Sequence, residues 1–170
     1  MRTGLRLSLA ADLRRNPVMS LNPAWKTGNC LNNILCLREA RARGADEVVM
    51  LNLSGQVTEA AASNLGFVQD GTVVTPPAEV GILAGITRGL LLEKICAHAD
   101  VPCREAIVLP EDFAKMEECF LMSTTKDVTP VAAIDKSKFN VGSASVTARL
   151  KIAFGEYTLA YARENPALKV

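Results

Sequence analysis

The chain has 170 residues, 49% of them hydrophobic, and its 19 basic and 18 acidic residues leave a formal net charge of +1. This length and composition predict one globular domain over residues 1–170 and exclude a disordered chain. The sequence holds no basic stripe and no apolar run of the ~20 residues that a membrane span needs, so we expect neither nucleic acid nor a membrane as a partner.

The cysteines indicate a reducing compartment. Their number is odd and their spacing is unlike that of a metal site, so we expect reduced thiols that mostly fill the core, and no metal. Arg6 and Asp12 interrupt the first apolar stretch too early for a signal peptide. We therefore expect a cytoplasmic protein. The five cysteines are Cys30, Cys36, Cys96, Cys103 and Cys119.

Apolar periodicity and turn residues predict the elements of the first half of the chain. Asp70-Gly71 is a strong hairpin signal. The expected elements are a strand at 5–10, a helix at 29–43 ended by Gly44, strands at 46–53, 57–59 and 63–69, and a hairpin partner at 72–74.

The second half mixes strands and helices without strict alternation, which argues against a parallel doubly wound sheet. The expected elements are a helix at 87–98, a strand at 101–109, a short helix from Pro110, strands at 118–124 and 128–134, and a helix at 145–165. The predicted fold class is α/β (α+β), with a curved, mostly antiparallel sheet or pseudo-barrel flanked by helices.

Lys26 lies between Trp25 and Thr27, just before the first predicted helix. A surface lysine whose stem covers apolar residues is the simpler interpretation of this position. If the site is buried, desolvation lowers the pKa of the ammonium toward neutrality, and the neutral amine becomes a nucleophile for Schiff-base chemistry.

Two hydroxyl-bearing stretches are candidate phosphate sites. Gly85 has no side chain and lets a ligand approach the backbone closely. Thr87 follows Gly85 and Ile86 at a predicted helix start, where unpaired amides favour an anion; a plain threonine cap is the alternative. Ser123, Thr124 and Thr125 end an apolar strand and have either phosphate-binding or turn chemistry.

Glu59 precedes a run of small residues, so its carboxylate has room to approach a cationic ring nitrogen; an exposed glutamate is the alternative. Asn64 either orients Glu59 or closes a turn. His98, the one histidine, is expected at the surface. An amine, a carboxylate and two sets of phosphate donors are together the parts of a pyridoxal phosphate site.

The order of these motifs resembles that of class IV aminotransferases, the fold-type IV pyridoxal phosphate enzymes, which include branched-chain and D-amino acid aminotransferases and aminodeoxychorismate lyase. The resemblance covers about residues 14–162. Gly66 departs from it, because the family usually has a bulky residue there. The matching motifs are Lys26-Thr-Gly-Asn29, Gly55-Gln-Val-Thr-Glu59, Ser63-Asn64, Asp70-Gly71, Thr75-Pro76-Pro77, Gly81–Arg88, Ser123-Thr124-Thr125 and Val128-Thr129-Pro130-Val131.

The resemblance implies a role for each candidate residue. Lys26 would form the Schiff base with pyridoxal 5′-phosphate and move the substrate proton, and Glu59, next to Asn64, would pair with the pyridine nitrogen. Ile86 and Thr87 would bind the phosphate, together with Thr124 and Ser123. Thr125 would face the carboxylate of the substrate.

The resemblance also implies that this chain is the large, C-terminal domain of a homodimeric enzyme and lacks the N-terminal small domain. The implied reaction transfers an amino group from an amino acid of branched-chain or D type to a 2-oxo acid. Two alternatives remain open at this point: a lyase like aminodeoxychorismate lyase, and a non-catalytic remnant of the family. We expect low activity if the chain acts alone.

Overall fold

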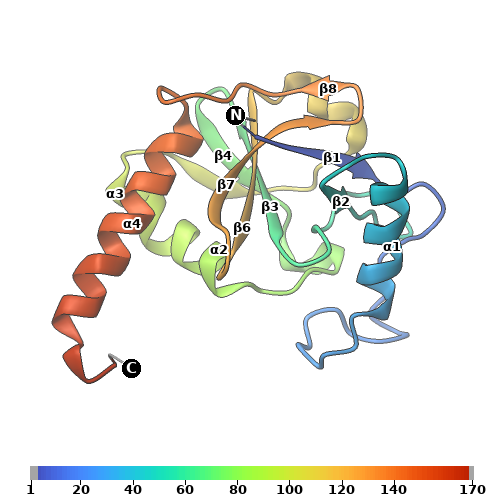
Figure 1. Cartoon of the computed structure of the whole chain (residues 1–170), viewed down its shortest axis with the longest axis horizontal. Helices are drawn as coiled ribbons and strands as arrows, with labels where there is room; N and C mark the ends of the chain where they lie inside the picture. The colour runs from blue at the N-terminus through green and yellow to red at the C-terminus, as the bar shows by residue number, and fades with distance from the viewer. Residues whose placement is uncertain (1–3, 169–170) are drawn as a thin grey trace.

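A computed structural model describes residues 4–168, and its main feature is one eight-stranded sheet with helices packed around it (Figure 1). The strands follow the order β2-β1-β7-β6-β3-β4-β5, with β8 paired to β7. They are β1 (Leu5–Leu9), β2 (Glu47–Val49), β3 (Asn64–Gln69), β4 (Thr72–Thr75), β5 (Cys103–Glu105), β6 (Glu118–Ser123), β7 (Asp127–Ile134) and β8 (Ser137–Lys138).

The sheet is mixed. Within the described residues, four strand pairs are antiparallel (β3–β4, β3–β6, β6–β7 and β7–β8) and three are parallel (β1–β2, β1–β7 and β4–β5). The α/β class is therefore confirmed, and antiparallel pairs outnumber parallel ones by one. β1 lies across the direction of β6 in Figure 1, so the sheet is strongly twisted.

The helices lie in two groups. α1 packs on β1 and β2, whereas α4 packs on β6 and β7 and α2 packs on β6 (Figure 1). The helices are α1 (Leu31–Ala42), α2 (Ile86–Leu90), a π-helical turn (Leu91–Ile95), α3 (Cys96–His98), α4 (Val146–Glu164) and 3-10 turns at Ala78–Val80, Pro110–Lys115 and Pro166–Leu168.

The central strands are buried on both faces. Along β3, Leu65 and Phe67 face one core cluster while Val68 faces a second cluster beneath α4. Phe120 and Met122 of β6 join that second cluster in the same alternation. A strand that is covered on both faces has a continuous run of apolar residues in its sequence. Such a run predicts the strand at residues 118–124.

Several sequence predictions differ from the structure. The strand expected at 101–109 is confined to β5, and residues 57–59 form no named strand, because Val57 makes only an isolated bridge with Leu51. In α1, Leu31 and Ile34 are 65% and 54% exposed, while the small residues Cys36 and Ala40 face the core.

The predictions for the hairpin, the cysteines and the histidine are confirmed. The hairpin at Asp70-Gly71 has both residues at positive φ, 49° and 69°, as a two-residue turn between twisted strands requires. The five cysteines are free thiols, and Cys36, Cys96 and Cys119 are buried. His98 is exposed and lies 3.3 Å from Glu156. Within residues 4–168, no helix has the length and apolar character to cross a membrane, and no cluster of three or more metal-ligating side chains is found.

Core packing explains why residue 66 is a glycine. A Cβ atom added at Gly66 would overlap the ring of Phe120, which lies opposite it across the β3–β6 pair. The ring of Phe120 thus fills the volume that a bulkier residue at position 66 would need.

We predict that Gly66→Ala lowers the free energy of unfolding by about 1–3 kcal/mol, the usual cost of overpacking a core. The control is Gly155→Ala in α4, where an added Cβ meets no atom within 4 Å and should stabilise the helix by about 0.5–1 kcal/mol. Urea unfolding of both variants measures the difference, and equal midpoints for Gly66→Ala and wild type would contradict the packing role of Phe120.

Candidate functional site

One cavity of about 810 Å³ contains every site residue selected from the sequence. It is bounded by the loop before α1, the segment before β3, the start of α2 and the β6–β7 turn, which lie along the lower side of the sheet in Figure 1. The predicted residues that line it are Lys26, Glu59, Asn64, Ile86, Thr87, Ser123, Thr124 and Thr125.

The carboxylate of Glu59 is buried and held on both oxygens. Its residue is only 4% exposed, which rules out the exposed-glutamate alternative. The Nη2 of Arg15 lies 2.9 Å from Oε1. The Leu83 N–H donates to Oε2 at 3.0 Å, and Asn64 Nδ2 donates to the same oxygen at 3.3 Å. These contacts allow the carboxylate one orientation.

Burial raises the pKa of Glu59 to about 7, because desolvation disfavours the charged carboxylate. The Arg15 guanidinium opposes this shift most strongly, followed by the Leu83 N–H and, more weakly, the Lys26 ammonium. The carboxyl group therefore titrates near neutral pH, where a small change in nearby charge alters its ionisation.

The position of the Asn64 side chain also explains why residue 85 is a glycine. Asn64 Nδ2 donates to the Leu83 carbonyl at 2.8 Å, and a Cβ added at Gly85 would overlap Asn64 Oδ1. The expected close neighbour of this glycine was a ligand. In the structure, the close neighbour is the side chain that orients Glu59.

The start of α2 lines the cavity with Gly85, Ile86 and Thr87. Gly85 is the residue before the helix, with an extended backbone and no side-chain cap, so the threonine-cap alternative does not hold for Thr87. Ile86 is 76% exposed, whereas Thr87 is buried. The first amides of a helix have no carbonyl partner within it, and they favour an anion at this end.

The hydroxyl run at the β6–β7 turn has a partly structural role. Ser123 Oγ accepts a hydrogen bond from the Lys126 N–H at 3.1 Å, as turn chemistry predicts. Thr124 and Thr125 are exposed, and the Thr125 hydroxyl lies 3.5 Å from that of Ser123. Ser123 thus shapes the turn, and the two threonines have hydroxyls available to a ligand.

Lys26 is exposed, and so is the neighbouring Trp25, at 64%. Of the two interpretations open for Lys26, the surface position therefore holds, and the buried ammonium does not. Two short hydrogen bonds shape the loop: Trp25 N–H donates to the Asn22 carbonyl and Thr27 N–H to the Trp25 carbonyl, both at 3.0 Å. They present Lys26 at the cavity wall with its side chain open to water.

The cavity lining also includes polar residues that were not selected from the sequence, among them Arg15, Asn33 and Ser63. Ser63 Oγ is a buried hydroxyl without a hydrogen-bond partner among the described residues, so it is available to a bound molecule. The sequence offers little reason to select Arg15, because the identical residue Arg14 precedes it and the two differ only in what the folded chain packs around them.

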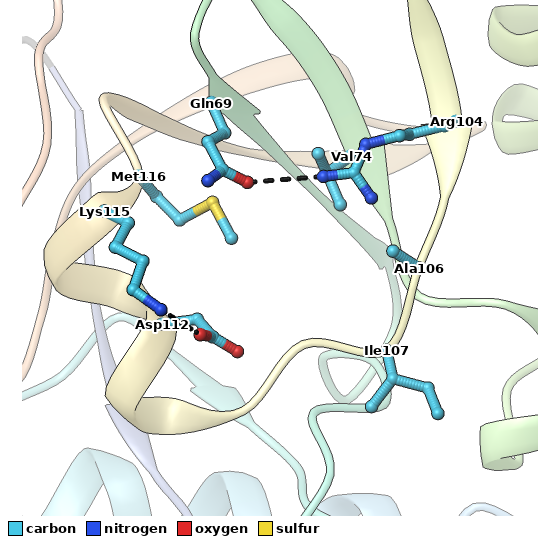
Figure 2. Close-up of a pocket in the computed structure, with 8 residues that line it drawn as sticks. All are labelled: Gln69, Val74, Arg104, Ala106, Ile107, Asp112, Lys115 and Met116. Atoms are coloured by element: carbon cyan, nitrogen blue, oxygen red, sulfur yellow. Dashed lines mark hydrogen bonds and ion pairs between the residues drawn. The ribbon is translucent and has the colours of Figure 1, made fainter.

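A second hollow, of about 200 Å³, lies between β4, β5 and the turn at Pro110–Lys115 (Figure 2). Figure 2 shows that both of its cations already have partners. Arg104 donates to Gln69 at 3.3 Å, and Lys115 lies 3.2 Å from Asp112. A ligand here would compete with these contacts, so the larger cavity is the candidate site.

The raised pKa of Glu59 predicts a pH dependence of stability. The folded state binds a proton more tightly than the unfolded state, so this contribution is complete below the unfolded pKa of 4.5 and is lost as pH rises through about 7. From pH 4.5 to 8, wild type should lose about 3 kcal/mol more unfolding free energy than Glu59→Gln, which has no proton to lose. Urea unfolding across this range is the measurement, and parallel pH profiles would contradict it.

Comparison with known proteins supplies a family. The family model described as amino-transferase class IV matches residues 5–134. The chain is 34% identical over 154 residues to a putative branched-chain-amino-acid aminotransferase of Methanocaldococcus jannaschii, covering 89% of this chain and 52% of that protein. It is 34% identical over 128 residues to the branched-chain-amino-acid aminotransferase of Escherichia coli (strain K12), covering 75% and 41%.

Solved structures agree. The branched-chain aminotransferase of Thermoproteus uzoniensis, crystallised with norvaline, superposes with a TM-score of 0.87 at 32% identity, over 96% of this chain and 54% of that one. The PLP-form (holo-form) of the branched-chain amino acid aminotransferase from Thermobaculum terrenum gives 0.87 at 27% identity, over 92% and 52%. The chain spans about half the length of these relatives. With the family model matching most of its length, this chain belongs to the class IV aminotransferase family.

Proposed function

We propose that this chain is the pyridoxal 5′-phosphate-binding large domain of an amino acid aminotransferase, which transfers an amino group from a branched-chain amino acid to a 2-oxo acid. The observation that carries the proposal is the single cavity, which brings an amine, a buried carboxylate and two groups of anion donors together from four separate segments. The names of the relatives support the choice of a branched-chain substrate.

The residues present fit the cofactor. The Ser63 hydroxyl has no hydrogen-bond partner among the described residues, and the start of α2 has no side-chain cap for its first amides. Both are therefore donors available to a ligand. Glu59, which lines the same cavity, is an acceptor held in place by the Leu83 N–H. When bound, pyridoxal phosphate supplies an aldehyde and a ring that stabilises negative charge at the amino acid Cα.

We assign each residue one task. The Lys26 amine binds the cofactor aldehyde and carries a proton to and from the substrate Cα. Glu59, oriented by Asn64, accepts a hydrogen bond from the ring nitrogen and favours its protonated form. The amides of Ile86 and Thr87, with the hydroxyls of Thr87, Ser123 and Thr124, bind the phosphate. Thr125 donates to the substrate carboxylate.

We further propose a cytoplasmic homodimer. The free cysteines fit a reducing compartment. Leu31, Ile34 and Leu35 of α1 are exposed apolar side chains, which suits a surface that a second copy covers.

Lys26 exposure supports a second proposal, namely that this chain alone turns over slowly or only binds the cofactor. Water reaches the Lys26 side chain, and in an open cavity it competes for the hydrogen bonds that would hold a ligand. Cofactor binding without turnover in the assays below would favour this proposal over the active enzyme.

We predict that wild type joins pyridoxal phosphate covalently at Lys26. Borohydride reduction followed by peptide mass mapping should find the cofactor on the peptide that contains Lys26, and Lys26→Ala should remove it. The matched control is Lys151→Ala, an exposed lysine on α4 outside the cavity, which should leave the modification intact. Modification that persists in Lys26→Ala, or is missing from wild type, sinks the assignment.

For amino transfer, we predict that wild type uses L-leucine with 2-oxoglutarate in preference to D-alanine. Lys26→Ala should reduce the rate at least ~10²-fold, the lower range for loss of a positioned acid–base group. The glutamate formed is measured by chromatography. A rate with D-alanine above that with L-leucine would instead favour a D-amino acid aminotransferase.

A further inference from the structure

Arg15 occupies the wall of the cavity and has no role in the residue set assigned above. Its Nη2 lies 2.9 Å from Glu59 Oε1, and the two side chains are 8% and 5% exposed. A buried carboxylate loses its hydration, and a cation at this distance offsets part of the cost of the charged form.

The same guanidinium contacts the loop that carries Lys26. Nη2 donates to the Pro23 carbonyl at 3.5 Å, three residues before Lys26. Nη1 donates to Asn16 Oδ1 at 2.9 Å and to Asn33 Oδ1, on α1, at 2.8 Å. The planar fork of arginine makes this set of contacts possible from one side chain, which an ammonium cannot reproduce.

Few charges act on Glu59. The charged groups with the largest influence on its carboxylate are Arg15 and Lys26, and Lys26 is open to water. Asn64 and the Leu83 N–H, which hold the other oxygen, are neutral. Arg15 is therefore the one buried cation in this set.

We propose that Arg15 is a positioning residue. It favours the ionised form of Glu59, orients the Glu59 carboxylate toward the cavity, and holds the loop that carries Lys26 beside Glu59. The inference rests on the proposed function, because an ionised Glu59 serves there to hold the ring nitrogen of the cofactor protonated. A neutral Glu59 has no negative charge to stabilise the protonated ring nitrogen, so the ring would withdraw electrons less strongly.

The first test needs no cofactor. Carboxyl ¹³C NMR, with the Glu59 signal assigned by its loss in Glu59→Gln, follows the titration of Glu59 in wild type and variants. Arg15→Gln should raise the pKa of Glu59 above the value of about 7 by at least one pH unit. Arg14→Gln is the matched control, because within residues 4–168 the Arg14 guanidinium donates to the backbone carbonyls of Ala10, Ala11 and Leu13 and not to Glu59.

The second test measures pyridoxal phosphate binding by fluorescence at pH 7.5. Arg15→Gln should weaken binding about tenfold or more, and Arg14→Gln should leave it unchanged. Arg15→Lys keeps the charge but not the fork, so the Glu59 titration should stay within half a pH unit of wild type while binding weakens as the Lys26 loop loses its contacts. If Arg15→Gln does not fold, the conservative variant Arg15→Lys still tests whether Arg15 is a positioning residue.

Two results would overturn the role of Arg15: a Glu59 titration that Arg15→Gln leaves in place, or cofactor binding by Arg15→Lys equal to that of wild type. Failure of the proposed function gives a different result. In that case wild type itself does not bind the cofactor, whatever the Glu59 titration shows.

Discussion

The candidate site depends on one electrostatic constraint, which is that the buried carboxylate of Glu59 needs partners. Burial alone would leave an uncompensated charge costing several kcal/mol, so the chain surrounds the carboxylate with a guanidinium, an amide and a backbone N–H. These partners come from the segment after β1, from β3 and from the segment before α2. Satisfying one carboxylate therefore brings three distant parts of the chain together.

The twisted sheet supplies the rigid frame for this arrangement. β3 and β6 lie side by side and are buried on both faces, so their ends are held by two core clusters. Asn64 is the first residue of β3 and Ser123 is the last residue of β6, so each strand places a polar side chain at the same end of the β3–β6 pair. Glu59 and the start of α2 meet them there. The loop that carries Lys26 is less enclosed, and Arg15 ties it to the frame.

Local pattern predicted most of the fold. The hairpin at Asp70-Gly71, the apolar strands β3, β6 and β7 and the long helix α4 each have a signal contained in their own residues. The prediction failed for residues 57–59, where the backbone bonds are shared among separate segments: Val57 N–H donates to the Val108 carbonyl and Thr58 N–H to that of Met50. Such pairing is extended but irregular, and no periodicity within the segment indicates it. The exposed Leu31 and Ile34 of α1 likewise follow a helical pattern whose core face is made of smaller residues.

The sequence by itself determined the membership of the site, because the order of Lys26, Glu59, Asn64, Thr87 and Ser123–Thr125 selected residues that all line one cavity. Only the tertiary structure decided their environments. Lys26, for which a surface and a buried position were both open, is exposed to water, whereas Glu59 is enclosed. Arg14 and Arg15 are adjacent and chemically identical, yet one binds backbone carbonyls and the other the central carboxylate. Burial and partners depend on which distant segments pack around a side chain, and that information is absent from its local sequence.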